Sequence, residues 1–90
     1  MVMIDDKPLV SIGVPVYNGE RFIRQALNSL LDQDYENFEL IISDNASTDQ
    51  TPEICQEYVV KDKRVRFYRN DPNLGAITNF DRVLALVSGK

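Results

Sequence analysis

Apolar and polar residues alternate along the chain in ways that predict three strands. Residues 9–16, LVSIGVPV, are apolar and largely β-branched without a charge, which is typical of a strand covered on both faces. The run FELIIS at residues 38–43 predicts a second strand. In VRFYR, residues 65–69, apolar and polar side chains alternate, so a half-exposed strand at a sheet edge is expected there.

A helical period of apolar residues follows each of these strands. The first helix is predicted from Glu20 to about Asp34, the second begins at Pro52 with Thr51 as its cap, and the last stops at Gly89. The apolar positions expected to face the sheet are Phe22, Ile23, Ala26, Leu27, Leu30, Leu31, Ile54, Cys55, Tyr58, Val59, Ile77, Phe80, Leu84 and Val87.

The element order βαβαβα predicts an α/β fold. Parallel strands joined by right-handed crossovers give a Rossmann-like three-layer α/β/α arrangement with strand order 3-2-1. The first two helices are then expected on one face of the sheet and the last helix on the other. The turns at 15–20, 44–49 and 69–75 should meet beyond the carboxyl ends of the strands, where such folds bind ligands.

The composition excludes several kinds of chemistry. Ninety residues make one small or partial domain, and a net charge of -4 argues against nucleic acid as a partner. With no histidine and the single Cys55, neither a Cys/His zinc site nor a Ser–His or Cys–His nucleophile can form. Cys55 is interpreted as core packing. Since there is no basic leader and no apolar run of ~18 residues, a cytoplasmic location is predicted.

Side chains at the three turns have the chemistry to bind a nucleotide base. Asp44 follows a buried strand and offers acceptors, Arg69 ends the next strand and offers donors, and Tyr17 offers an aromatic face. Uracil presents one N–H between two carbonyls, which suits such a set. Neither G-x-G-x-x-G nor G-x-x-x-x-G-K-[ST] occurs, so the two familiar phosphate-binding loops are missing.

Three motifs occur in order: P-x-Y-N-x-E from Pro15 to Glu20, the segment SDNASTDQT at residues 43–51, and N-x-G at Asn73 and Gly75. Together they resemble the amino-terminal part of the catalytic domain of family 2 glycosyltransferases, inverting nucleotide-sugar enzymes of GT-A fold. The similarity covers residues 8–90. The chain reads AITNF where A-R-N commonly follows the N-x-G turn, which leaves the subfamily and the acceptor open.

The resemblance implies that one group of residues binds or borders the nucleotide: Pro15, Tyr17, Glu20, Asp44, Asp49 and Arg69. Asn18, Asn73 and Gly75 are expected to shape turns, Gly75 by allowing a positive φ. Structural roles remain alternatives for several of them. Asp49 and Glu20 suit a helix cap or an acidic first turn, Asp44 suits a turn former, and Arg69 suits a solvated edge.

By the same resemblance, the substrates are a nucleoside-diphosphate sugar, UDP- or dTDP-linked, and a glycan or lipid-linked acceptor. A Mg²⁺ or Mn²⁺ ion is expected in the full-length enzyme, with its D-x-D motif and the catalytic base beyond Lys90. No residue of this chain is therefore assigned to catalysis or to a metal. The literal D-x-D at Asp32 and Asp34 ends a helix at the opposite edge of the sheet and is rejected. Peripheral membrane association is an option for the full-length protein.

Other interpretations stay open at this point. One is a non-catalytic nucleotide-binding or assembly module that is complete at 90 residues. A phosphoacceptor receiver domain is a weaker alternative, because it needs an acidic pair where the chain has Tyr17 and Asn18.

If the first strand lies beside an absent fourth strand, its edge has unpaired N–H and C=O groups. A homodimer through this edge is accordingly predicted.

Overall fold

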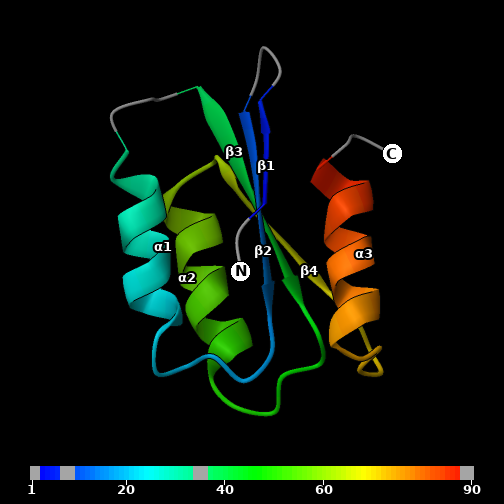
Figure 1. Cartoon of the computed structure of the whole chain (residues 1–90). Coiled ribbons are helices and arrows are strands. Elements are labelled where there is room, and N and C mark those ends of the chain that lie inside the picture. The colour runs from blue at the N-terminus through cyan, green and yellow to red at the C-terminus, as the bar shows by residue number, and fades with distance from the viewer. Residues whose placement is uncertain (1–2, 7–9, 34–36, 88–90) are drawn as a thin grey trace.

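Three layers, with helices on both faces of one sheet, make up the molecule (Figure 1). This computed structural model describes residues 3–6, 10–33 and 37–87. The elements are β1 (Met3–Asp6), β2 (Val10–Val16), α1 (Ile23–Leu31), β3 (Phe38–Asp44), α2 (Thr51–Lys61), β4 (Val65–Arg69) and α3 (Ala76–Val87). Helices α1 and α2 lie on one face and α3 on the other, as predicted. None of these helices is long and apolar enough to cross a membrane.

The sheet has the order β1-β2-β3-β4, and its last three strands are parallel. The predicted order 3-2-1 for the three parallel strands is thereby confirmed. Their register places Val16 beside Asp44, and Asp44 beside Arg69. Because the three strands end level with one another, the turns that follow them start at one edge of the sheet, the lower edge in Figure 1.

Strand β1 was not predicted, and it corrects one expectation. It pairs antiparallel with β2, from Met3 opposite Gly13 to Asp6 opposite Val10. The expected unpaired edge along this part of β2 is therefore wrong, and the homodimer built on that edge loses its basis. The short segment escaped prediction because two adjacent acids, Asp5 and Asp6, make it resemble a polar terminus.

The larger core lies between the sheet and the pair α1 and α2. Ile23 and Leu27 of α1 have no exposed surface, so the predicted stripe is confirmed at these two positions. The helix begins at Ile23 and not at Glu20, because a turn at residues 19–22 comes first, and Phe22 is 55% exposed. Thr51 does not cap α2 as predicted: Gln50 takes that position, and the Thr51 hydroxyl accepts a hydrogen bond from Gly19 N–H at 2.8 Å.

The smaller core lies beneath α3, where Val83 and Val87 pack on Ile41 of β3. The predicted face of this helix is partly wrong, because Ile77 is 80% and Leu84 44% exposed. The helix is turned so that Asn79, Val83 and Val87 face the sheet at intervals of four residues. Gly89 and the side chain of Phe80 lie outside the described part of the structure.

The corrected face of α3 makes a direct prediction about stability. Val83→Ala should lower the free energy of unfolding by about 2 kcal/mol, because it removes two fully buried methyl groups and leaves a cavity. Ile77→Ala, also a truncated β-branched residue on α3, should cost less than about 0.5 kcal/mol because the side chain is in water. Urea unfolding measures both. Equal losses, or a larger loss at Ile77, would contradict the orientation of the helix.

Candidate functional site

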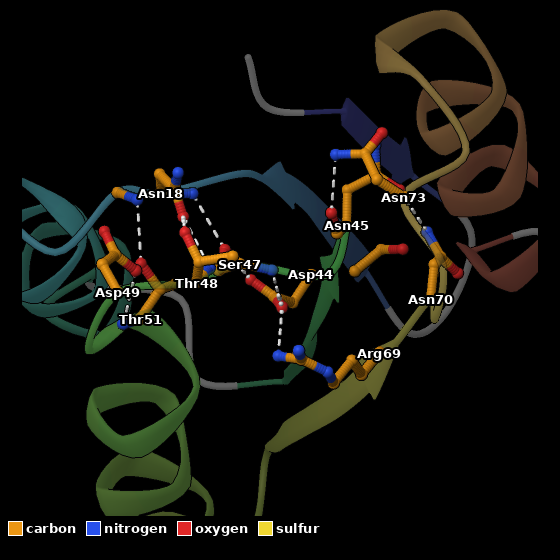
Figure 2. A network of polar contacts seen from close by, with 12 residues as sticks. Asn18, Asp44, Asn45, Ser47, Thr48, Asp49, Thr51, Arg69, Asn70 and Asn73 are labelled. Atoms are coloured by element: carbon orange, nitrogen blue, oxygen red, sulfur yellow. Dashed lines mark hydrogen bonds and ion pairs between the residues drawn. The ribbon is translucent and has the colours of Figure 1, made fainter.

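The candidate site is built where the turns after β2, β3 and β4 come together at the carboxyl edge of the sheet. Asp44, the last residue of β3, is in register with the last residues of β2 and β4. Figure 2 shows the side chains of these turns pointing toward one another across that edge. Two hydrogen-bonded groups result, one toward α1 and α2 and the other toward α3, with Asp44 between them.

Asp44 is a fully buried carboxylate whose oxygens are engaged within the protein. Its Oδ2 accepts hydrogen bonds from the backbone N–H of Ser47 at 3.0 Å and from Arg69 Nη1 at 3.1 Å, and its Oδ1 accepts one from the Ser47 hydroxyl. The Arg69 side chain is 38% exposed and pairs with Asp44 from the rim (Figure 2). The expected contact between Asp44 and a base requires an exposed oxygen, and in this structure Asp44 has none.

Toward α1 and α2, the turn after β2 is joined to the turn after β3 through Asn18. The backbone N–H of Asn18 donates to the Ser47 hydroxyl at 2.8 Å, and its side-chain oxygen accepts from the N–H of Thr48 at 2.8 Å. Asn18 has a positive φ of 49°, a conformation that Asn tolerates better than most residues. Asn18, which was predicted to shape the turn after β2, therefore also joins this turn to Ser47 and Thr48 of the turn after β3.

On the same side, Glu20 and Asp49 form hydrogen bonds between the turn after β2 and the turn after β3. Glu20 N–H donates to Asp49 Oδ2 at 3.2 Å, and Glu20 Oε1 accepts from the N–H of Gln50 at 2.9 Å. Asp49 Oδ1 accepts from the N–H of Thr51 at 2.9 Å. Burial acts to raise the pKa of the Asp49 carboxyl, but the hydrogen bonds from Thr51 and Glu20 outweigh it and leave that pKa below its usual value. Both acids thus tie turns together.

Two glycines are required at these turns for different reasons. A Cβ on Gly19 would lie 2.8 Å from Val16 Cγ2 and 2.9 Å from Phe22 Cζ, so the turn after β2 has no room for one. Gly75 has open space around it but a φ of +83°, which side chains disfavour. The sequence analysis assigned Gly75 to this kind of turn, whereas the close packing at Gly19 was not foreseen.

Toward α3, asparagine side chains form a continuous hydrogen-bonded network, in which Asn45, Asn70 and Asn79 are buried and Asn73 is exposed. Asn79, on the first turn of α3, accepts a hydrogen bond from the Ser43 hydroxyl at 2.6 Å and donates to the Ser43 carbonyl at 3.0 Å. Asn70 Nδ2 bridges Asn79 Oδ1 at 2.8 Å and Asn45 Oδ1 at 3.2 Å. Asn45 Nδ2 donates to Asn73 Oδ1 at 3.0 Å, and Asn73 Nδ2 donates to the backbone carbonyl of Asn45 at 2.8 Å (Figure 2). This network is what turns Asn79 toward the sheet.

A pocket of about 690 Å³ opens beside this network. Its lining residues come from the end of β2, the turns after β3 and β4, and the start of α3: Pro15, Val16, Tyr17, Asn45, Asn73, Ala76, Ile77 and Asn79. Tyr17 is 51% exposed, so its ring is available to a ligand. The walls are largely apolar, the polar side-chain groups are three amides and the Tyr17 hydroxyl, and none of the lining residues described is charged.

The predicted site residues are thus divided among different places. Pro15, Tyr17 and Asn73 line the pocket, whereas Glu20 and Asp49 lie on the α1 and α2 side. The sequence analysis missed five lining residues: Val16, which it assigned only to a strand, and Asn45, Ala76, Ile77 and Asn79. Asn45 could have been found, because it directly follows Asp44 in the same turn. Ala76, Ile77 and Asn79 stand at the start of α3, whose buried face had been assigned incorrectly.

The residues described do not fit a divalent metal. No group of three or more His, Cys, Asp or Glu side chains in the described ranges is placed to hold one. Asp44 and Asp49 both use their oxygens for hydrogen bonds within the protein. Cys55 is buried in the core as predicted, and burial raises the pKa of its thiol to about 12, with smaller contributions from the carboxylates of Asp44 and Asp49.

Comparisons with known proteins agree with this fold. The structure of S. aureus TarS 1-349 in complex with UDP matches with a TM-score of 0.75 and 32% identity, covering 88% of this chain and 24% of that one. The mannosyltransferase PcManGT from Pyrobaculum calidifontis, solved with GDP-Man and Mn²⁺, matches with a TM-score of 0.73 and 24% identity over 82% of this chain and 23% of that one. The fold is accordingly that of GT-A glycosyltransferases.

Sequence comparison narrows the class to a family. An uncharacterized glycosyltransferase from Haemophilus influenzae is 46% identical over 68 residues, which are 76% of this chain and 27% of the relative. The family model described as "Glycosyl transferase family 2" matches residues 11–90, and the chain belongs to this family. It spans about a quarter of the length of this relative and of both solved structures.

The buried position of Asp44 predicts a structural effect of its substitution. Asp44→Asn keeps the shape but replaces an acceptor with an N–H₂ group, which must then face either the N–H of Ser47 and Arg69 or the Ser47 hydroxyl. We expect a loss of about 1 to 3 kcal/mol in the free energy of unfolding. The matched change Asp81→Asn, on the exposed side of α3, should stay within about 0.5 kcal/mol. Similar losses for both variants in urea unfolding would show that Asp44 is not a structural centre.

Proposed function

We propose that this chain is the nucleotide-recognition part of a glycosyltransferase that moves a sugar from a nucleoside-diphosphate sugar to an acceptor hydroxyl with inversion at the anomeric carbon. Residues 1–90 are then a partial domain of a longer enzyme. The proposal rests on family membership and on one observation: a pocket at the carboxyl edge of the sheet, lined by Pro15 and Tyr17 of the P-x-Y-N-x-E motif. The UDP in the TarS complex supports a nucleotide as the ligand.

The pocket suits the neutral base of the nucleotide better than its diphosphate. Its apolar walls and the exposed ring of Tyr17 favour a flat, uncharged group, which can stack on an aromatic face. In this arrangement Pro15 and Tyr17 hold the base directly. Asp44 acts indirectly, because it holds Arg69 and the turn that contains Ser47 in place. Glu20 and Asp49 likewise hold their turns without touching the ligand.

The rest of the reaction requires residues that follow this part of the chain. A Mg²⁺ or Mn²⁺ ion, when bound by the full-length enzyme, neutralises charge on the departing diphosphate, and a carboxylate base takes the proton of the acceptor hydroxyl. We assign both to the segment after Lys90. The acceptor is proposed to be a glycan or lipid-linked sugar, and the location cytoplasmic, peripheral to the membrane in the full-length protein. Within residues 1–90 the function is to bind and orient the donor.

Binding by the chain alone tests this proposal. Calorimetry with UDP should find at most about millimolar affinity, a free energy near 4 kcal/mol, because only the base and its surroundings are held. Adding Mn²⁺ or Mg²⁺ should change it little, since the described residues form no metal site. Sugar transfer should be undetectable. A strongly metal-dependent, micromolar affinity would contradict the assignment and would require a metal site within residues 1–90.

A pair of aromatic variants provides the matched control. Tyr17→Ala should weaken UDP binding severely, because stacking of a base on an aromatic ring is worth about 1 to 3 kcal/mol. Phe22→Ala removes an equally exposed ring, 55% against 51%, from the adjacent part of the same turn but outside the pocket. Its affinity should equal that of the unchanged chain. Loss of binding in Phe22→Ala but not in Tyr17→Ala would contradict the proposal and would show that the ligand binds beside Phe22, outside the pocket.

A further inference from the structure

Strand β4 forms one edge of the sheet, because in the described part of the chain it pairs with β3 and with no other strand. The carbonyl of Arg64, just before the strand, accepts a hydrogen bond from the N–H of Leu40 at 2.8 Å. The N–H of Asn70, just after it, donates to the carbonyl of Asp44 at 2.7 Å. Even-numbered residues of this segment therefore turn their backbone groups toward β3. The residues of β4 that turn theirs away are Val65, Phe67 and Arg69.

This edge leaves backbone hydrogen-bonding groups unused. The N–H of Val65 donates to the carbonyl of Asp62 at 3.1 Å, and no other bond holds the outward groups of the strand within the described structure. The carbonyl of Val65 and both backbone groups of Phe67 and Arg69 are therefore available. At an exposed sheet edge of this kind, an extended chain can add as a further strand.

The same edge concentrates the positive charge of the chain. Five of the ten Lys and Arg residues lie within residues 61–69, where Asp62 is the one acid, although the chain as a whole carries a net charge of -4. Asp62 is already paired with Arg64 at 2.8 Å. Lys63 and Arg66 are exposed and form no ion pair with any described residue. An acidic partner at this edge therefore meets two cations that it can pair with.

This charge also distinguishes between possible partners. If β4 paired with β4 of a second copy, Lys63 and Arg66 of both copies would gather at one junction, and like charges on adjacent strands are destabilising. Basic residues on an edge strand are a common protection against such self-pairing. The same residues favour a strand that carries acids.

The two faces of β4 predict the side chains that suit the partner. Val65 and Phe67 pack in the larger core, on the side of α1 and α2, whereas Arg66 and Tyr68 lie on the other face. Helix α3 covers β1, β2 and β3 on that face but has no contact with β4 among the residues described. Residues directly opposite each other on neighbouring strands share a face. A partner residue opposite Arg66 is thus favoured as an acid, and one opposite the half-buried Phe67 as an apolar residue.

We propose that the open edge of β4 is a docking site for an extended acidic segment of a partner protein, in which acids alternate with apolar residues. The segment adds to the sheet as a further strand, and Lys63 and Arg66 select it by charge. None of the pocket residues belongs to this edge, so the inference goes beyond nucleotide recognition and does not depend on it.

Peptides followed by NMR with the whole chain test the docking site. The end-blocked peptide EVDVEVE should shift the amide signals of Phe67 and Arg69 and slow their hydrogen exchange, because these N–H groups gain acceptors. The amide of Gln25, on the exposed side of α1, should not change. The peptide KVKVKVK should not bind. EVDVEVE with N-methylated valines keeps the charge but loses the donors that face β4, and it should bind about tenfold more weakly. Equal affinity of the methylated peptide would overturn strand addition.

Charge reversal separates docking from general effects on folding. Arg66→Glu should weaken EVDVEVE about fivefold and allow KVKVKVK to bind. Arg21→Glu, at another exposed arginine in the turn before α1, should change neither affinity. An unchanged preference in Arg66→Glu would overturn the proposal. Slower exchange at Phe67 as the concentration of the chain rises without peptide would show a second copy at the edge and overturn it too. So would binding to phosphatidylserine vesicles without binding of EVDVEVE, because the partner would then be a membrane.

Discussion

The burial of the Asp44 carboxylate is the constraint on which the carboxyl edge of the sheet depends. A charge removed from water is unfavourable unless it is paired and hydrogen-bonded, and Asp44 has no exposed surface. Ser47 and Arg69 meet this requirement, one from the turn after β3 and the other from the end of β4. Since Ser47 also accepts from Asn18 N–H, the turn after β2 is drawn into the same arrangement. All three turns are thus positioned before any ligand arrives.

The second constraint is the polar contact between α3 and the sheet. Asn79 stands where an apolar residue would ordinarily pack, and its bonds to Ser43 and Asn70 hold the first turn of the helix. A buried network of hydrogen bonds permits fewer arrangements than apolar packing, because each bond has a required direction. Here it places Asn45, Asn73 and Asn79 in the lining of the pocket. The side chains that fix α3 on the sheet therefore also line the pocket.

The sequence predicted the parallel strands, the layers and the edge at which the turns meet, because these follow from hydrophobic period and connection handedness. It did not predict which face of α3 is buried, since Ile77 and Leu84 fit the helical period and the bonds of Asn79 depend on residues 36 positions away. Among the site residues, Pro15 and Tyr17 lie at the pocket, whereas Asp44 is covered by its own partners. Hydrogen bonds between side chains of different turns depend on the tertiary structure, so a local sequence pattern does not predict them.

Amide hydrogen exchange at two turn residues tests the central claim, that buried side chains hold these turns in place. The N–H of Ser47 donates to Asp44, and that of Leu74 donates to Asn45, although neither residue is in a helix or strand. The account predicts that both amides exchange nearly as slowly as that of Ile42 in the centre of β3. Exchange of both at the rate of unprotected loop amides would contradict it.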